Sequence, residues 1–171
     1  AGIYYILMED FDLDSISWET LGTKYTDEEA FGANFDGNGH KLYNLNKLTK
    51  DNLGIFGYAR NAQIKNLGIV VKSGVQISSK NSGALMMDTG INCTINNCYV
   101  IGDFVTTSDN AGSAAIMVRY FSGTISNCFV QGSVVTYGGS SLGSGSYGKA
   151  GGIIGTGDAT ISNCICLADV Y

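Results

Sequence analysis

Proline is absent from this chain of 171 residues, and only 15% of its residues are charged. Because proline cannot donate a backbone hydrogen bond, its absence is typical of a chain whose N–H groups nearly all enter sheet ladders. No apolar run approaches the roughly 20 residues that a membrane-spanning helix needs, and no signal segment opens the sequence. We therefore predict no membrane insertion. The strand-like start at 1–5 predicts a piece of a longer chain.

Basic residues are few and acidic residues are unevenly placed. Residues 1–51 hold ten acids and four bases, for a net charge of −6, whereas residues 52–171 hold five acids and six bases, for a net charge of +1. A phosphate backbone is normally met by a stripe of Lys and Arg, which this sequence lacks. The charge pattern thus argues against nucleic-acid binding.

Histidine occurs once, at His40, and cysteine five times without C-x-x-C spacing. These residues supply a zinc site poorly, and the lack of an H-E-x-x-H motif excludes a metallopeptidase of that class. His40 follows the run 36–39, whose composition is that of a turn, so we predict a structural role for it. We predict no cofactor.

Two short motifs recur in the same order along the chain. The first, Ile-x-Asn-(Cys/Leu), starts at residues 64, 95, 125 and 161, with a weaker copy at 42. The second is led by glycine and occupies 54–57, 83–86, 112–115 and 151–154. A repeat of about 30 residues, with apolar residues that alternate and no helical period, is typical of stacked parallel strands. The sequence therefore predicts an all-β parallel solenoid of about five coils.

The asparagine of the first motif has a mechanical explanation. The residues on either side of it, such as Ile95 and Cys98, both belong to the core although they lie three positions apart. A tight corner between them resolves this parity, and asparagine tolerates the left-handed conformation that such a corner needs. Stacked corners would align the amides as an Asn ladder, made of Asn44, Asn66, Asn97, Asn127 and Asn163.

Three of the cysteines, Cys98, Cys128 and Cys164, take the slot that Leu45 and Leu67 fill in the earlier copies. We therefore expect them to behave as small buried apolar residues. Strands in register hold their Cβ atoms about 4.8 Å apart, whereas a disulfide needs roughly 3.5–4.5 Å. The thiols are predicted to be free. The complete set predicted to face inward is Ile95, Cys98, Val100, Ile125, Cys128, Val130, Ile161 and Cys164.

In these two motifs, and in the segments 4–13 and 31–40, the sequence resembles the GLUG-motif repeats of bacterial surface proteins. The Phe-Asp-Gly-Asn-Gly-His run at 35–40 is the most specific part. Such repeats occur in secreted adhesin-like proteins and beside the catalytic domain of streptococcal immunoglobulin A1-cleaving metallopeptidases. The resemblance implies a right-handed parallel β-helix, export, and an accessory or adhesive role. It implies one domain over 1–171, with an acidic first coil at 1–51 and repeats at 52–171. The copy at 112–115 departs from the pattern, which predicts an irregular coil.

The residues that follow each corner point outward by parity, and most of them are large and apolar. Two rows result, Gly68, Tyr99, Phe129 and Ile165 beside Val70, Ile101, Gln131 and Leu167. A face of this kind indicates a partner, a neighbouring domain or a ligand. We predict protein contact, with glycan stacking as the alternative, through an outer stripe made of Tyr99, Ile101, Phe129, Ile165 and Leu167.

Other chemistry is considered at three places. Asp10, Asp12 and Asp14 alternate, so a strand would place them on one face as weak calcium candidates. Asp103 and Asp169 share a slot two coils apart, at about 9.6 Å, near the limit for an inverting glycosidase. A carbohydrate-active enzyme is thus the alternative to a non-catalytic binding or structural module. The Gly/Ser-rich segment 138–149 reads as a projecting loop.

Overall fold

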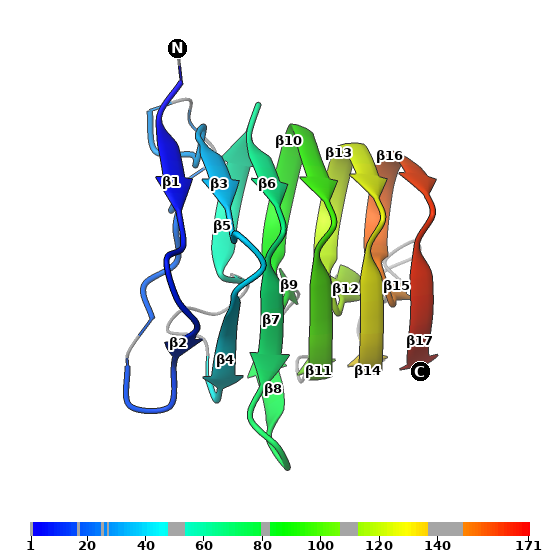
Figure 1. Cartoon of the computed structure of the whole chain (residues 1–171). Coiled ribbons are helices and arrows are strands. Elements are labelled where there is room, and N and C mark those ends of the chain that lie inside the picture. Colours follow the sequence, from blue (N-terminus) through cyan, green and yellow to red (C-terminus); the bar gives the residue numbers. More distant parts are fainter. Residues whose placement is uncertain are drawn as a thin grey trace.

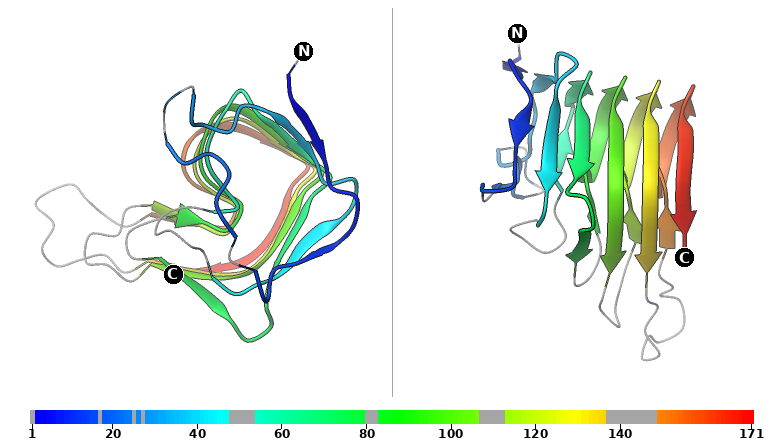
Figure 2. Two further views of the ribbon diagram at one scale, coloured as in Figure 1. Left: turned by 90° about the vertical axis from the view of Figure 1, so that its left-hand side faces the viewer. Right: turned by 60° about the horizontal axis from the view of Figure 1, so that its bottom comes forward.

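Parallel strands wind into a β-solenoid of about four turns, in a computed structural model that describes residues 2–16, 18–24, 26, 28–47, 54–79, 83–106, 113–136 and 149–171. Successive coils lie side by side from the N-terminal to the C-terminal end (Figure 1). Seen along the axis, they superpose as a three-sided tube (Figure 2). The predicted parallel solenoid is thus confirmed. Its right-handedness and its count of about five coils stay predictions.

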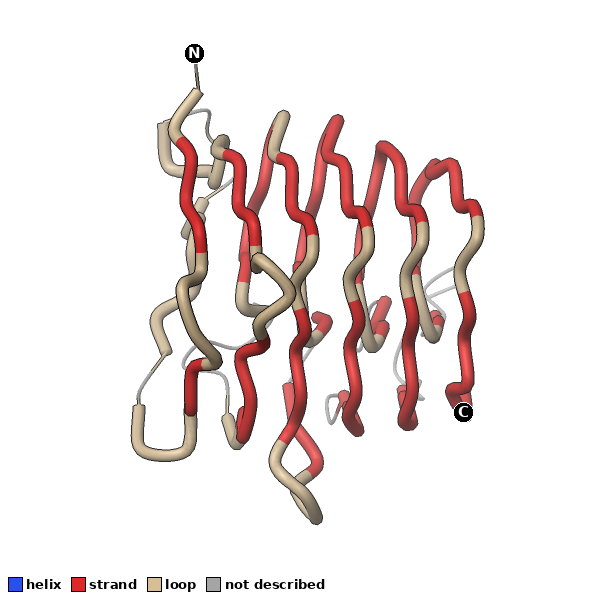
Figure 3. The backbone as a smooth tube through the Cα atoms, in the orientation of Figure 1, coloured by secondary structure: helices blue, strands red, loops and turns tan. Residues whose placement is uncertain are grey.

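Three sheets form the sides of the tube, and every strand pair in them is parallel. Sheet A contains β1 (Tyr4–Ile6), β3 (Asn34–Asp36), β5 (Phe56–Arg60), β6 (Gln63–Lys65), β10 (Met87–Asn96), β13 (Val118–Ser126) and β16 (Ile154–Ser162). Sheet B contains β2 (Phe11–Asp12), β4 (Lys41–Leu45), β7 (Gly68–Val71), β8 (Gln76–Ser79), β11 (Tyr99–Thr106), β14 (Phe129–Thr136) and β17 (Ile165–Val170). Sheet C contains β9 (Gly83–Ala84), β12 (Ser113–Ala115) and β15 (Lys149–Gly151). The described residues include no helix, and so none long enough to cross a membrane (Figure 3).

Asparagine makes the corner between sheets A and B, as predicted. Asn66, Asn97, Asn127 and Asn163 have φ angles of 54°, 53°, 55° and 51°, which is the left-handed region. Asn97 Nδ2 donates to Asn66 Oδ1 at 2.8 Å, and Asn163 Nδ2 donates to Asn127 Oδ1 at 3.4 Å. The side chain that tolerates the corner therefore also links one coil to the next.

The weaker first copy of this motif, at 42–45, does not occupy the slot that the sequence predicts for it. Lys41 pairs with Gly68, so His40 rather than Leu45 lies opposite Leu67. The run 37–40 makes the corner of this coil, and Asn44 lies within β4 despite its φ of 56°. The similarity of 42–45 to the other copies hid the extra residues of the turn.

The glycine-led motif does not mark one slot either. Gly83 pairs with Ala114, two residues after Gly112, and Ala115 pairs with both Ala84 and Gly151. The predicted irregular coil at 112–115 is wrong for its described part, since β12 is in register with β9 and β15. The apolar residues that enter the core here are Leu85, Met86, Ile116 and Met117, all fully buried.

The core fills the tube between the sheets. Six of the eight residues predicted to face inward, Ile95, Cys98, Val100, Ile125, Cys128 and Val130, are buried. The other two belong to the last coil: Ile161 is 46% exposed and Cys164 is half-buried. Both are in register with buried residues, Ile161 with Ile125 and Cys164 beside the paired Phe129 and Ile165. Their exposure comes from the absence of a further described coil over them.

The N-terminal end of the tube is partly covered by the segment between β2 and β3. Leu21 and Phe31 bridge to Phe56 and Ala59 and so occupy the edge of β5. Trp18 Nε1 donates to the carbonyl oxygen of Ile55 at 3.2 Å, and Trp18, Leu21 and Phe31 pack against the core. This covering segment comes from residues outside the repeats.

Candidate binding surfaces

The outer stripe predicted from the sequence lies on the outside of sheet B. Tyr99, Phe129 and Ile165 pair in one row, and Ile101, Gln131 and Leu167 pair in the next. The alternate residues Val100 and Val130 are fully buried, so the predicted parity holds. Exposure rises toward the last coil: Tyr99, Ile101 and Phe129 are half-buried, whereas Ile165 is 58% and Leu167 62% exposed.

The Tyr99 ring lies against the neighbouring coil. It occupies the space that a side chain at Gly68 would need, so the ring covers the backbone of the preceding strand. Glycine at 68 is therefore what allows the aromatic side chain to lie down on the sheet. One side of the ring rests on the protein and the side chain stays half-buried.

A groove runs beside the stripe. Val70 pairs with Ile101 and Gln76 with Asp103, so residues 71–75 oppose the single residue Gly102. Residues 72–75 leave the sheet as a turn, the loop that reaches lowest in Figure 3. The turn walls a cavity of about 200 Å³, whose other lining residues include Ile101, Asp103 and Gln131. Apolar and polar side chains thus meet on one outer face.

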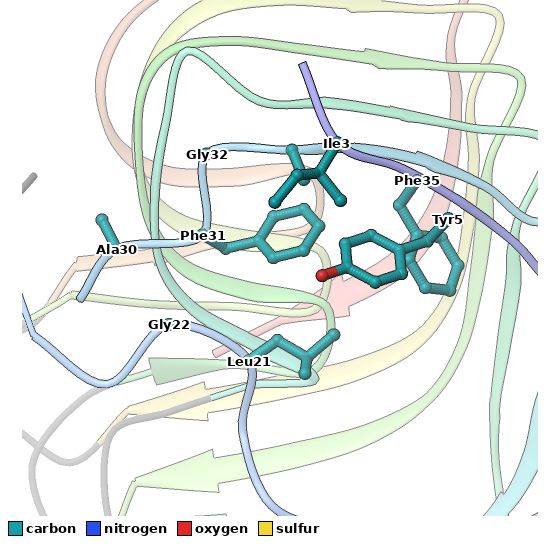
Figure 4. A pocket seen from close by; sticks show the side chains of 9 residues that line it. Ile3, Tyr5, Leu21, Gly22, Ala30, Phe31, Gly32 and Phe35 are labelled. Carbon is teal, nitrogen blue, oxygen red and sulfur yellow. The ribbon is translucent and has the colours of Figure 1, made fainter. Parts of the chain in front are cut away.

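A larger hollow, of about 470 Å³, opens at the N-terminal end of the tube (Figure 4). The side chains of Ile3, Tyr5, Leu21, Phe31 and Phe35 converge on it, and the Tyr5 hydroxyl points into it. The centroids of the Tyr5 and Phe31 rings are 6.1 Å apart. The sequence did not predict this hollow, because its walls come from β1, β3 and the covering segment, none of which belongs to the repeats.

The three acids proposed as weak calcium candidates each have a partner in a later coil. Asp10 Oδ1 lies 3.1 Å from His40 Nδ1, Asn44 Nδ2 donates to Asp12 at 3.1 Å, and Lys72 Nζ lies 2.6 Å from Asp14. These donors explain the alternation without a metal ion. Within the described ranges, no group of three or more His, Cys, Asp or Glu side chains is placed to hold one.

Asp103 and Asp169, the two carboxylates of the alternative enzyme hypothesis, occupy equivalent positions two coils apart, as predicted. Asp103 pairs with Ser133, which pairs with Asp169. Ser133 Oγ donates to Asp103 Oδ1 at 2.7 Å. A hydroxyl thus lies between the two acids and bonds to one of them.

The thiols of the corner slot form a column through the last three coils. Cys98, Cys128 and Cys164 are free, as predicted, and the Cys128 N–H donates to Cys164 Sγ at 3.4 Å. The hydrogen bond from Cys98 lowers the pKa of the Cys128 thiol to about 7. The same contact and burial raise the pKa of Cys98.

One buried ion pair was missed. Asp88 is 1% exposed, and Arg119 Nε and Nη2 donate to its two oxygens at 2.7 and 3.0 Å. Burial raises the pKa of Asp88, and the Arg119 guanidinium opposes that rise. The residues lie 31 positions apart, which is one repeat, so the period of the sequence contained the signal.

Comparisons with known proteins add no identification. The chain matches no family model, no curated protein and no solved structure.

Proposed function

We propose that this chain is a non-catalytic binding or structural module of a secreted or surface protein of a bacterium, and that it contacts a protein partner through the outer stripe. The location and the adhesin-like role rest on the resemblance of the repeats. The choice of surface rests on the face of sheet B. The alternative is a carbohydrate-active enzyme that uses the slot of Asp103 and Asp169.

The observation that carries the proposal is the in-register row of Tyr99, Phe129 and Ile165, flanked by Ile101 and Leu167. A freely solvated sheet face would alternate apolar inward residues with polar outward ones. Large apolar side chains in adjacent coils instead make a contiguous patch, and patches of a few hundred Å² mark interaction sites. Burial of such a patch contributes roughly 25 cal/mol per Å² before the cost of association.

A glycan is the second candidate partner, because the groove beside the stripe is mixed in character. Lys72, Asp103 and Gln131 line it together with Ile101. Hydroxyl groups of a sugar would find donors and acceptors there, while its apolar ring face would lie on the aromatic row. The glycan candidate thus requires the groove and the stripe to act together.

The experiment is the double variant Tyr99→Ser with Phe129→Ser, measured for retention on a glycan array and on a panel of immobilised extracellular proteins. The matched control is Tyr120→Ser, which removes a 40% exposed aromatic ring from the outside of sheet A. We expect retention to fall at least tenfold in the double variant and to persist in the control. Unchanged retention in a folded double variant would contradict the proposal, and turnover of a polysaccharide would favour the enzyme.

A further inference from the structure

Two thiols of the cysteine column, Cys98 and Cys128, lie in interior coils and share one geometry. The asparagines that precede them have φ angles of 53° and 55°, and the residues that follow them, Tyr99 and Phe129, pair in register. Each sulfur lies against the carbonyl oxygen two residues before it, at 3.3 Å for Cys98 and 3.1 Å for Cys128. The two side chains therefore point the same way, and their sulfur atoms are separated by about one coil, roughly 4.8 Å.

This separation fits neither a disulfide nor a zinc ion. A disulfide requires sulfur atoms about 2.05 Å apart, so its formation would have to move one coil against the next. Zinc takes four ligands in a tetrahedron, and the described part of the chain holds no metal-binding group of three or more His, Cys, Asp or Glu side chains. The pair can therefore serve only an ion that takes two ligands.

Two metal–thiolate bonds in a line span the separation of the sulfur atoms. A metal–sulfur bond of about 2.3 Å gives a sulfur–sulfur distance of about 4.6 Å when the ion lies midway, which is close to the repeat of the stacked strands. Monovalent copper has a filled d shell, prefers soft thiolate ligands and accepts linear coordination by two of them. The stacking of the coils thus sets a ligand spacing that suits Cu(I).

The surroundings of the pair are dry and supply hydrogen bonds to sulfur. Both cysteines are 2% exposed, and the fully buried Leu67 occupies the same slot in the preceding coil. The backbone of Leu67 hydrogen-bonds to the Cys98 sulfur and the backbone of Cys98 to the Cys128 sulfur. One coil further, the Cys128 N–H makes this contact with the Cys164 sulfur at 3.4 Å. Hydrogen bonds of this kind stabilise thiolates, which are the form that binds a metal ion.

We propose that the sulfur atoms of Cys98 and Cys128 bind one Cu(I) ion in linear coordination and so link two neighbouring coils. On binding, both S–H bonds break, two Cu–S bonds form and two protons leave to solvent, while copper stays Cu(I) throughout. The resulting complex carries a single negative charge, which the backbone donors stabilise. Asn97 and Asn127, which precede the two cysteines, are exposed, so the ion enters at the corner. The site lies inside the tube and is independent of the outer stripe.

The other thiols provide the controls. Cys93 lies in β10 opposite Gly123, so it has no stacked thiol in the following coil. Cys164 is half-buried and stacks on Cys128 from the last described coil. A form that retains only the proposed pair therefore carries Cys93→Ala, Cys164→Ala and Cys166→Ala.

The first experiment adds Cu(I) to this pair-only form, anaerobically and under reducing conditions, as the complex with the competing chelator bicinchoninic acid. We expect the protein to withdraw one Cu(I) ion per chain. Its melting temperature should rise, because the ion binds the folded state. X-ray absorption should show two sulfur neighbours at about 2.3 Å and no third ligand.

The second experiment compares two single variants of the chain that keep the other four cysteines, so it does not depend on the folding of the pair-only form. Cys98→Leu keeps the slot filled, as leucine does at position 67. It should weaken Cu(I) binding by more than about 100-fold, since even groups outside the coordination shell change affinity by roughly 10–100-fold. Cys93→Ala should leave the affinity unchanged. Undiminished binding by Cys98→Leu would place the ion at Cys128 and Cys164 and overturn the proposal. A third ligand in the absorption spectrum, or a folded pair-only form that leaves copper with the chelator, would overturn it as well.

Discussion

At the N-terminal end of the solenoid the columns of stacked donors finish on carboxylates, whereas at the C-terminal end they finish on an amide oxygen and uncovered apolar side chains. Asp36, Asp12 and Asp14 accept from Asn66, Asn44 and Asn46 in the following coil. Asn163 and Ile161 occupy the corresponding kinds of position at the other end without a covering coil. The two ends of the solenoid thus differ in the groups that they present.

Part of the uneven charge of the sequence belongs to this difference, since Asp10, Asp12, Asp14 and Asp36 accept hydrogen bonds from later coils. The N-terminal third carries a net charge of −6 while the repeats are nearly neutral. Acids are concentrated where donors from the next coil need terminal acceptors, as the partners of Asp10, Asp12 and Asp14 show. Asn66 accepts from Asn97 and donates to Asp36, so one asparagine is acceptor and donor at once.

Among substitutions in the interior coils, Arg119→Met should lower the free energy of unfolding most. It leaves both ends of the solenoid unchanged. It leaves the buried Asp88 carboxylate without its partner, and loss of one member of a buried pair costs about 3–5 kcal/mol of unfolding free energy. The pKa of Asp88, already raised by burial, should rise further. A folded-state pKa above the unfolded one makes stability fall as pH rises through it. The variant should therefore be relatively more stable at pH 5 than at pH 8 by chemical denaturation.

The control for this prediction is the double variant Asp88→Asn with Arg119→Met, which removes the charge as well as its partner. We expect it to be more stable than Arg119→Met alone and to lose the added dependence on pH. A single variant that unfolds like the original chain at both pH values would show that the pair contributes nothing.

The interior and the C-terminal end are compared most directly by making the same substitution at two paired positions. Ile125 is fully buried and Ile161, its partner in register, is 46% exposed. Ile125→Ala should lower the free energy of unfolding by about 2–5 kcal/mol, because it leaves a cavity in the core. Ile161→Ala should cost less than about 1 kcal/mol, since water already reaches the side chain. Equal losses in chemical denaturation would mean that the last coil is covered in solution.

The repeats were predictable because each motif has a local mechanical cause. In the copies at 64, 95, 125 and 161 an apolar residue, a left-handed asparagine and a second apolar residue define a corner. This pattern predicted the buried residues of two coils, at 95–100 and 125–130, and the outward position of Tyr99. The first copy failed because 42–45 imitates the motif while 37–40 makes the turn. Local similarity does not reveal how many residues a turn absorbs.

The features missed by the sequence depend on contacts between distant segments. The hollow at the N-terminal end needs Tyr5 beside Phe31 and Phe35, and no period relates these residues. The Asp88–Arg119 pair differs, because its residues are separated by one repeat, a spacing that is visible in the sequence. Stacking rules therefore predict partners inside the repeats and fail outside them.

Substitutions at Asn97 should have a moderate effect on the free energy of unfolding. Comparing two of them separates the contribution of the corner conformation from that of the hydrogen bond. Asn97→Gly keeps the left-handed corner and removes the bond to Asn66, which should cost about 0.5–1.5 kcal/mol. Asn97→Ala adds the cost of a left-handed residue with a Cβ, about 1–2 kcal/mol more. The measurement is chemical denaturation, with the same pair of substitutions at Asn163 as the comparison. There the difference between alanine and glycine should shrink, because the last coil can relax.

The smallest effect concerns the acceptor that ends the ladder, tested by Asp36→Asn. The hydrogen bond from Asn66, then the Asn38 N–H and the Lys65 ammonium, lower the pKa of Asp36 from 3.8 to about 2. A lowered folded-state pKa contributes stability above the unfolded value and loses it as pH falls through the folded one. The original chain should therefore exceed the variant by about 1 kcal/mol or less near pH 6, and this advantage should vanish between pH 4 and pH 2. Asp169→Asn, at the open end where no described residue donates to the carboxylate, should change stability little at either pH. An advantage that persists at pH 2, or one equally large for Asp169, would show that the two ends are not finished differently.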